Sequence, residues 1–354
     1  MNKLVLIGNG FDLAHGLKTS YTDFLVWYLN KASYKMCDNM FYEDELISYK
    51  TSFRVKYEEI KSITDFLNFQ EQQLIKGHIK YKHDFFPKLI RNLSIQNWVD
   101  IEYRYYLSVL EVMNKRGFES KGLEYEDALE NLRKLNLSFE TLKNELVEYL
   151  KTIDTAGKKD NKIVDNFEKY ICEIDKKGHN NKLFLNFNYT STLLNYWDMF
   201  KTPPGKEGKR DANLINIHGT IDDEKNPIIF GYGDDMDTHY AVIENLNEKE
   251  FLKNMKKYWY HKTSNFQKFK SFINSENYEV YIFGHSCGIS DRVMLNRIFD
   301  HENCKSIRIF YYMKDNSYND HFEKTQEITK HFKPENRQRI EDLIVPFDQS
   351  CPLS

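Results

Sequence analysis

A glycine-bracketed turn near the N-terminus is the first segment whose residue types suit chemistry. The apolar run 4–7 leads directly into Gly8-Asn9-Gly10-Phe11-Asp12. Because glycine has no Cβ, the chain can turn sharply after a strand and a ligand can approach the main chain, so the amides at 8–10 could bind a phosphate. The dinucleotide fingerprint has a third glycine, and position 13 is Leu13, so an ordinary strand-to-loop turn is the alternative.

Three more loops with polar side chains follow predicted strands. They are Asn188-Tyr189-Thr190, His218-Gly219-Thr220 and the run 284–291, which reads Gly-His-Ser-Cys-Gly-Ile-Ser-Asp. Ligands of open α/β sheets bind at the carboxyl ends of strands, near the point where strand order reverses. Four such loops in one crevice predict a binding site. Each also has a structural alternative: Asn188 or Asp291 could cap a helix, and His218 could be a core histidine.

Strands and helices are predicted to alternate in the second half of the chain, which favours a mainly parallel sheet flanked by helices. The predicted strands are 3–7, 182–187, 213–217, 227–230, 278–283 and 305–312, and the predicted helices are 191–200, 247–274, 291–301 and 319–331. The segment 30–180 instead carries helical spacing, as at Phe139, Leu142, Leu146 and Leu150. We therefore predict an α/β core, 1–29 plus 181–354, with a large helical insertion, 30–180, after the first strand. The hydrophilic runs 155–161 and 201–210 are predicted to be exposed loops.

Composition limits the classes of function. The chain has 354 residues, a hydrophobic fraction of 41% and a formal charge of −3, which indicates a globular protein and argues against one built mainly to neutralise phosphates. No apolar run is long enough to cross a membrane. The five cysteines are scattered and form no Cys-x-x-Cys pair, so we predict no metal site, no disulfide scaffold and a cytoplasmic location.

Two further segments have weaker functional interpretations. The acidic loop 234–237 could bind a hard cation, but a solvated loop is favoured because the EF-hand spacing is missing. Lysines and aromatic residues alternate over 253–260 and could bind nucleic acid. A core stripe with a solvated face is favoured there, so nucleic acid is not an expected partner.

The segment 6–25 (Leu-Ile-Gly-Asn-Gly-Phe-Asp-Leu-Ala-His-Gly-Leu-Lys-Thr-Ser-Tyr-Thr-Asp-Phe-Leu) resembles the signature of the bacterial abortive-infection AbiH family, and 97–102 resembles a second segment of it. The order of motifs is also similar, more distantly, to sirtuin-like NAD-binding domains of antiphage effectors. Their Gly-x-Gly loop, Asn element, His-Gly pair and Gly-x-Ser loop with a downstream acid match Gly8 and Gly10, 188–190, His218-Gly219, and Gly284, Ser286 and Asp291.

The resemblance implies a Rossmann-like, sirtuin-like fold, with NAD+ as substrate or ligand and no prosthetic group. It further implies an antiphage NAD+ hydrolase that cleaves the nicotinamide–ribose bond. His218 is the candidate general base, Asn188 suits a ribose hydroxyl or the attacking water, and Asp12 could stabilise the sugar cation. The expected ligand-binding residues are Gly8, Asn9, Gly10, Phe11, His15, Tyr189, Thr190, Gly219, Gly284, Ser286 and Asp291.

Two departures from the sirtuin-like pattern matter. Thr190 stands where those domains carry an acid, which weakens the expected ribose contact, and the Cys-x-x-Cys zinc module of deacylases is missing. The alternatives are therefore a nucleotide-binding sensor without catalysis and, less favoured, a nuclease. A phage-derived trigger and self-association are further expectations, as is a site that is occluded at rest, because a constantly active NAD+ hydrolase would harm its own cell.

Overall fold

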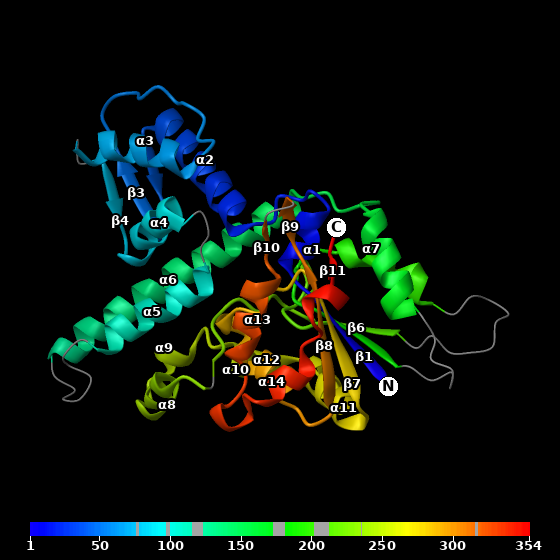
Figure 1. The fold of residues 1–354 in the computed structure, drawn as a ribbon. Helices are drawn as coiled ribbons and strands as arrows, with labels where there is room; N and C mark the ends of the chain where they lie inside the picture. Colours follow the sequence, from blue (N-terminus) through cyan, green and yellow to red (C-terminus); the bar gives the residue numbers. More distant parts are fainter. Residues whose placement is uncertain are drawn as a thin grey trace. The chain divides into compact units, whose positions relative to one another are not determined.

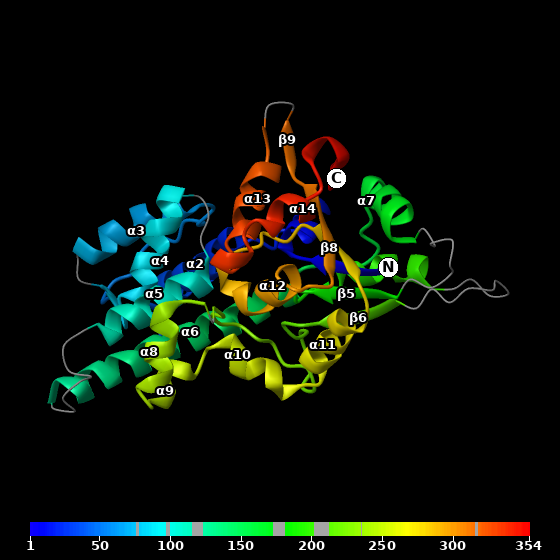
Figure 2. The same ribbon diagram turned by 60° about the horizontal axis from the view of Figure 1, so that its bottom comes forward.

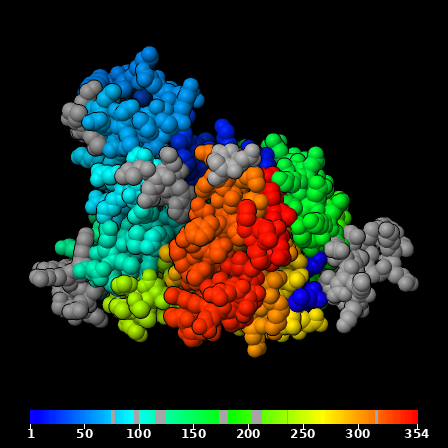
Figure 3. Space-filling view, in the orientation of Figure 1, coloured from blue at the N-terminus to red at the C-terminus, as the bar shows by residue number. Residues whose placement is uncertain are grey.

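The computed structural model describes residues 1–75, 78–96, 100–114, 123–172, 181–201, 212–234, 236–315 and 318–354. Figure 1 draws the chain as a ribbon, and Figure 3 shows the same view with all atoms. The chain divides into two compact units. Unit 1 comprises Met1–Lys18, Ile153–Ile229 and Lys256–Ser354, and unit 2 comprises Thr19–Thr152 and Phe230–Met255. In the described ranges, no helix is long and apolar enough to cross a membrane.

Unit 1 is built on a six-stranded sheet in which every pairing is parallel. Its strands are β1 (Asn2–Ile7), β5 (Lys182–Asn186), β6 (Ala212–Asn216), β7 (Tyr278–Phe283), β8 (Cys304–Tyr311) and β11 (Cys351–Pro352). The spatial order is β11-β8-β7-β1-β5-β6, so the chain builds outward from β1 on one side and then returns to build outward from β7 on the other. This is the strand order of Rossmann folds, with the reversal point between β1 and β7. The predicted Rossmann-like parallel sheet is confirmed.

Helices cover both faces of this sheet (Figures 1 and 2). Leu4 and Leu6 of β1 face a core formed with α11 (Asn265–Ser275), α12 (Arg292–Phe299), α13 (His321–Thr329) and α14 (Arg339–Leu343). Val5 and Ile7 face the opposite core, formed with α1 (Asn9–Ala14), α7 (Asn161–Asn166) and the short helices η1 (Phe167–Cys172) and η2 (Thr192–Phe200). Strands buried on both faces need apolar residues at consecutive positions, which is why β1 shows no polar alternation.

Unit 2 combines helices with a small sheet. Its helices are α2 (Tyr21–Asn39), α3 (Ile63–Ile75), α4 (Phe85–Gln96), α5 (Ile101–Met113), α6 (Leu123–Lys151), α8 (Thr238–Asn245) and α9 (Lys249–Leu252). The predicted leucine stripe is buried on α6. An antiparallel sheet of β2 (Phe41–Glu43), β3 (Ile47–Lys50) and β4 (Ile79–Tyr81) was not predicted, because strands of three or four residues are too short to show periodicity. The carboxylate of Asp44 forms the turn between β2 and β3 by accepting from the amides of Leu46 and Ile47.

Two predicted elements of the second half are wrong. Residues 227–230 form no strand. Pro227 has no amide hydrogen for a ladder, although the amide of Ile229 donates to the carbonyl of His218 at 2.8 Å. The predicted helix 247–274 is broken into α9, α10 (Lys256–Trp259), η3 (Tyr260–Lys262) and α11. The breaks allow Lys256 and Tyr260 to be buried in unit 1.

Three parts of the predictions fall wholly or partly outside the described residues. They are positions 97–99 of the second AbiH-like segment, most of the predicted loop 201–210, and Asp235 of the acidic loop. The predicted loop 155–161 is described, and it is largely exposed up to the start of α7.

Candidate functional site

The four polar loops meet at the carboxyl ends of β1, β5, β6 and β7. Phe187, directly after β5, joins two of them: its ring centroid lies 5.1 Å from that of His218 and 4.2 Å from that of His285. The side-chain amide of Asn188 donates to the carbonyl of Gly8 at 3.0 Å, so it ties the β5 loop to the β1 loop and does not cap a helix. The convergence expected from the parallel sheet is therefore present at the point where strand order reverses.

The glycine turn has a different role from the predicted one. The amides of Gly8, Gly10 and Phe11 donate to the carbonyls of Phe283, Gly284 and Gly8, at 3.1, 2.8 and 2.8 Å. These donors are therefore used within the chain, and the structure does not support the prediction that they are open to a phosphate.

Close backbone packing explains why glycine is needed on both sides of this contact. Gly284 has a φ of +72°, and a Cβ there would overlap the main-chain nitrogen of Phe11. A Cβ on Gly10 would lie 2.7 Å from the carbonyl oxygen of Gly284. The glycines of the first and last loops thus allow the ends of β1 and β7 to pack main chain against main chain.

A buried ionic group, which we call the Asp291 cluster, lies beside this contact and consists of Asp291, Lys256, His218 and His285. Oδ1 of Asp291 lies 2.7 Å from Nζ of Lys256 and 3.2 Å from Nε2 of His218, and Oδ2 lies 3.6 Å from Nε2 of His285. Lys256 is 0% exposed and His218 is 4% exposed. The Asp291 side chain makes no N-cap hydrogen bond to α12, so its alternative role as a helix cap is excluded.

Protonation within the Asp291 cluster follows from burial and charge. Burial, and then the charge of Lys256, lower the pKa of His218, and burial lowers the pKa of His285 to about 4. Burial would raise the pKa of Asp291, but Lys256 and His218 outweigh it and hold that pKa well below its usual value. At neutral pH the cluster therefore contains an ammonium, a carboxylate and two neutral imidazoles.

The tautomer of His285 follows from its neighbour. The amide of Cys287 donates to Nδ1 of His285 at 2.9 Å. A neutral ring that accepts at Nδ1 carries its proton on Nε2, the nitrogen that faces Asp291.

The family model described as "Bacteriophage abortive infection AbiH" matches residues 4–313. The chain belongs to the AbiH family. The match starts in β1 and ends at the first residue of β9 (Met313–Asp315), so it contains all four loops and the whole Asp291 cluster. Membership confirms the predicted family and gives this AbiH protein a function in phage abortive infection. A comparison with curated proteins finds no match.

A second buried acid of this AbiH protein comes from α1. The Thr190 hydroxyl donates to Oδ2 of Asp12 at 2.6 Å. Oδ1 of Asp12 is buried and has no hydrogen-bond partner among the described residues. Thr190 therefore does not replace the acid of the sirtuin-like pattern directly. It binds an acid supplied by the first loop.

The Asp12 carboxyl makes stability depend on pH in a predictable direction. Burial raises the pKa of Asp12 above its unfolded value of 3.8. The folded state therefore binds this proton more tightly than the unfolded state does. The stabilisation that Asp12 gives the folded protein is present at low pH and is lost as pH rises through the raised pKa. We expect Asp12→Asn to gain stability relative to wild type as pH rises from about 4 to neutral, measured by urea unfolding. Parallel curves for the two proteins would contradict this assignment.

The other predicted ligand-binding residues are distributed around the loops. The ring of His15 contacts groups outside the Asp291 cluster. Its Nδ1 donates to the Phe11 carbonyl at 2.7 Å, and its Nε2 lies 2.5 Å from the Tyr196 hydroxyl. The Tyr189 hydroxyl donates to the carbonyl of Ile229 at 3.1 Å. Asn9 and Ser286 are exposed.

The remaining loop residues are mostly structural. Phe11 is fully buried against the ring of His15 at a centroid distance of 4.7 Å, and the amide of Gly219 closes a turn on the carbonyl of Asn216 at 3.2 Å. The two described acids of the 234–237 loop are used locally: Asp234 accepts from the amide of Met236, and Asp237 caps α8. No group of three or more potential metal ligands occurs among the residues with described positions.

Sequence reasoning missed Lys256 and Tyr260. Both belong to the 253–260 run, which was interpreted as a helix with a solvated face, whereas Lys256 pairs with Asp291 and the hydroxyl of Tyr260 lies 3.2 Å from Nε2 of His218. No local signal distinguishes Lys256 from the neighbouring lysines. His285 lay inside a predicted loop but was given no role, although its position next to Gly284 placed it at the end of β7.

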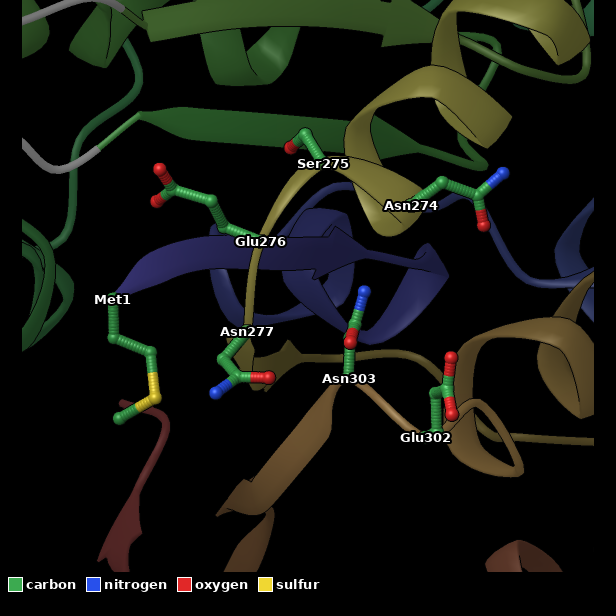
Figure 4. Close-up of a pocket in the computed structure, with 7 residues that line it drawn as sticks. All are labelled: Met1, Asn274, Ser275, Glu276, Asn277, Glu302 and Asn303. Carbon is green, nitrogen blue, oxygen red and sulfur yellow. The ribbon is translucent and has the colours of Figure 1, made fainter.

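A surface hollow at the other end of the sheet is not a candidate site. It is lined by residues that precede β1, β7 and β8, namely Met1, Asn274, Ser275, Glu276, Asn277, Glu302 and Asn303 (Figure 4). These residues lie at the amino ends of the strands, away from the four loops. The hollow is open and shallow, and ligands of this class of sheet bind at the carboxyl ends.

Proposed function

We propose that this AbiH protein is an abortive-infection effector that binds NAD+ at the carboxyl end of its Rossmann-type sheet and hydrolyses the nicotinamide–ribose bond. The observation that carries the proposal is the meeting of four strand-end loops at the reversal point, with a buried, neutral His218 among them. Loss of NAD+ from an infected cell would account for an abortive-infection phenotype.

The proposed reaction needs one general base and a group that stabilises the positive charge that develops on the ribose. The oxygen of a water attacks C1′ of the ribose, and the bond from C1′ to the pyridine nitrogen breaks with its electron pair staying on that nitrogen, so that nicotinamide leaves neutral. The water proton passes to His218, and the products are ADP-ribose, nicotinamide and one proton. Asn188 would orient the water or a ribose hydroxyl, and Asp12 would stabilise the sugar cation.

The polar groups of the site are engaged with one another in the described arrangement, as expected for an effector that is inactive until a trigger binds. Nε2 of His218 faces Asp291 and Tyr260, its ring also hydrogen-bonds the main chain of Phe187, and the Gly8 and Gly10 amides are used within the chain. We therefore propose that a phage-derived trigger, or self-association, opens the β1–β7 contact and frees a nitrogen of His218.

The test is nicotinamide release from NAD+ by purified protein, alone and with lysate from phage-infected cells as the source of trigger. We expect one ADP-ribose per NAD+ consumed, and a loss of about 100-fold in rate for Asn188→Ala, because the water or ribose would no longer be oriented. Asn195→Ala is the matched control, because that amide binds the 155–158 loop instead, through the carbonyls of Thr155 and Lys158. Equal rates for wild type and Asn188→Ala would remove Asn188 from the mechanism.

A nucleotide sensor is the second candidate, and the engaged ring nitrogens of His218 favour it, because they leave no free base to take a proton from water. Such a protein would bind NAD+ or ADP-ribose without turnover. Calorimetric binding by wild type, with no nicotinamide released over hours in the presence of the trigger, would decide for the sensor. The nuclease hypothesis is weaker, since Lys256 and Tyr260 of its proposed binding stretch are buried.

A further inference from the structure

Lys256 is a buried cation that the proposed reaction does not use. Its Nζ lies 2.7 Å from Oδ1 of Asp291 and 3.4 Å from the carbonyl oxygen of Ser290. It stands at the start of α10, a single helical turn, in the segment where the chain re-enters unit 1. Burying an ammonium away from water is strongly unfavourable unless a nearby anion offsets the lost hydration, so the burial of Lys256 requires the Asp291 carboxylate.

The same carboxylate oxygen connects Lys256 to the imidazole of His218. Oδ1 of Asp291 is 3.2 Å from Nε2 of His218, and the second oxygen faces His285 at 3.6 Å. Asp291 is therefore held between the ammonium of Lys256 and the imidazole of His218, a group that can gain or lose a proton. Because both side chains contact Oδ1 of Asp291, a change in the charge or position of Lys256 alters the electrostatic environment of His218.

Charge balance shows what Lys256 contributes. With Lys256 present, the ammonium and the carboxylate cancel, and both imidazoles stay neutral. Without it, a buried carboxylate would remain unpaired, and the imidazole in contact with it would take up a proton. A protonated His218 could not accept a proton from water.

We propose that Lys256, acting through the carboxylate of Asp291, is the positioning residue that holds His218 in place and uncharged. The proposal deepens the proposed function and rests on it for the use of His218 as the base. The titratable groups that face His218 are Lys256, Asp291, His285 and Tyr260, with Tyr189 at a centroid distance of 6.3 Å.

The test follows the titration of His218 by NMR of histidine-labelled protein, with the signal assigned from its loss in His218→Gln. We expect the titration midpoint to rise by about one pH unit or more in Lys256→Met and to stay near the wild-type value in Lys256→Arg. In Asp291→Asn it should fall, because the attraction of the carboxylate is lost while Lys256 remains. Opposite shifts in the two charge-removing variants are a pattern that a merely structural role would not produce.

Lys257→Met is the matched control, because it removes the same charge from the next, half-buried residue, whose Nζ lies 5.8 Å from the ring centroid of Tyr258. An unchanged midpoint in Lys256→Met, or an equal shift in Lys257→Met, would overturn the proposal. If Lys256→Met does not fold, the proposal is overturned by an Asp291→Asn variant in which the His218 titration midpoint does not fall. Because this readout needs no turnover, a wild-type protein that releases no nicotinamide would remove the proposed function while the titration still decides the role of Lys256. Where turnover is seen, the acidic limb of its pH profile should move to higher pH in Lys256→Met.

Discussion

Replacing His218 with glutamine is expected to lower the rate of nicotinamide release by a factor of about 100 to 10,000, the usual contribution of a positioned general base. Glutamine retains a polar group beside Oδ1 of Asp291 and the Tyr260 hydroxyl, so the variant should stay folded. The measurement is the initial rate of nicotinamide formation under activating conditions, together with the thermal unfolding midpoint.

His301→Gln is the appropriate control for this substitution. His301 is a partly buried histidine of the same unit, and its Nε2 lies 2.9 Å from Oδ1 of Asn274 at the amino end of the sheet. We expect a rate within about two-fold of wild type, since a surface hydrogen bond contributes little. Equal rates for wild type and His218→Gln would show that His218 is not the base, even if NAD+ is consumed.

Substitution of Gly284 by alanine is expected to have the largest effect on stability. A left-handed residue with a Cβ costs about 1–2 kcal/mol, and here the new methyl group would also overlap the main-chain nitrogen of Phe11. A flexible side chain could move aside, but main chain held by the hydrogen bond from Gly10 to Gly284 at 2.8 Å cannot do so without separating β1 from β7. We expect a loss of more than about 4 kcal/mol in the free energy of unfolding, close to the whole stability of many proteins.

Gly16→Ala isolates the steric part of this effect. Gly16 has nearly the same φ, +71°, but a Cβ there would meet no atom within 4 Å. The free energy of unfolding of Gly16→Ala should therefore fall only by the cost of the left-handed conformation, about 1–2 kcal/mol. The check is the urea midpoint of both variants, and similar midpoints would mean that the two loops do not pack as described.

The parallel sheet of unit 1 was predictable because its signal is local. Each buried strand is a short apolar run, and a polar loop follows it, as Gly8 follows β1 and His218 follows β6. A general property of parallel sheets then places the ends of these strands at one edge, so that Asn188, His218 and Asp291 could be assigned to one site without coordinates. The family signature at 6–25 is equally local.

The same local signals failed where a neighbour decides the conformation. Residues 227–230 are apolar enough for a strand, but they lie against the turn after β6, where Ile229 pairs with the main chain of His218. The segment 247–274 has helical composition, yet it breaks where burial of Lys256 and Tyr260 is worth more than continued helix.

The chemistry of the site was decided by contacts between distant parts of the chain. The sequence offered Asp12 and Thr190 as separate candidates, and the fold joins them across 178 positions. It offered Gly8 and Gly10 as phosphate donors, and the fold turns their amides toward β7 and its loop. Lys256 and Asp291 are 35 positions apart, and their pairing in the core keeps both of them charged while His218 stays neutral. Burial and charge pairing depend on what surrounds a side chain, so residue types and spacing determined where the candidate site would be, and tertiary packing determined which of its groups are charged, paired or closed to a ligand.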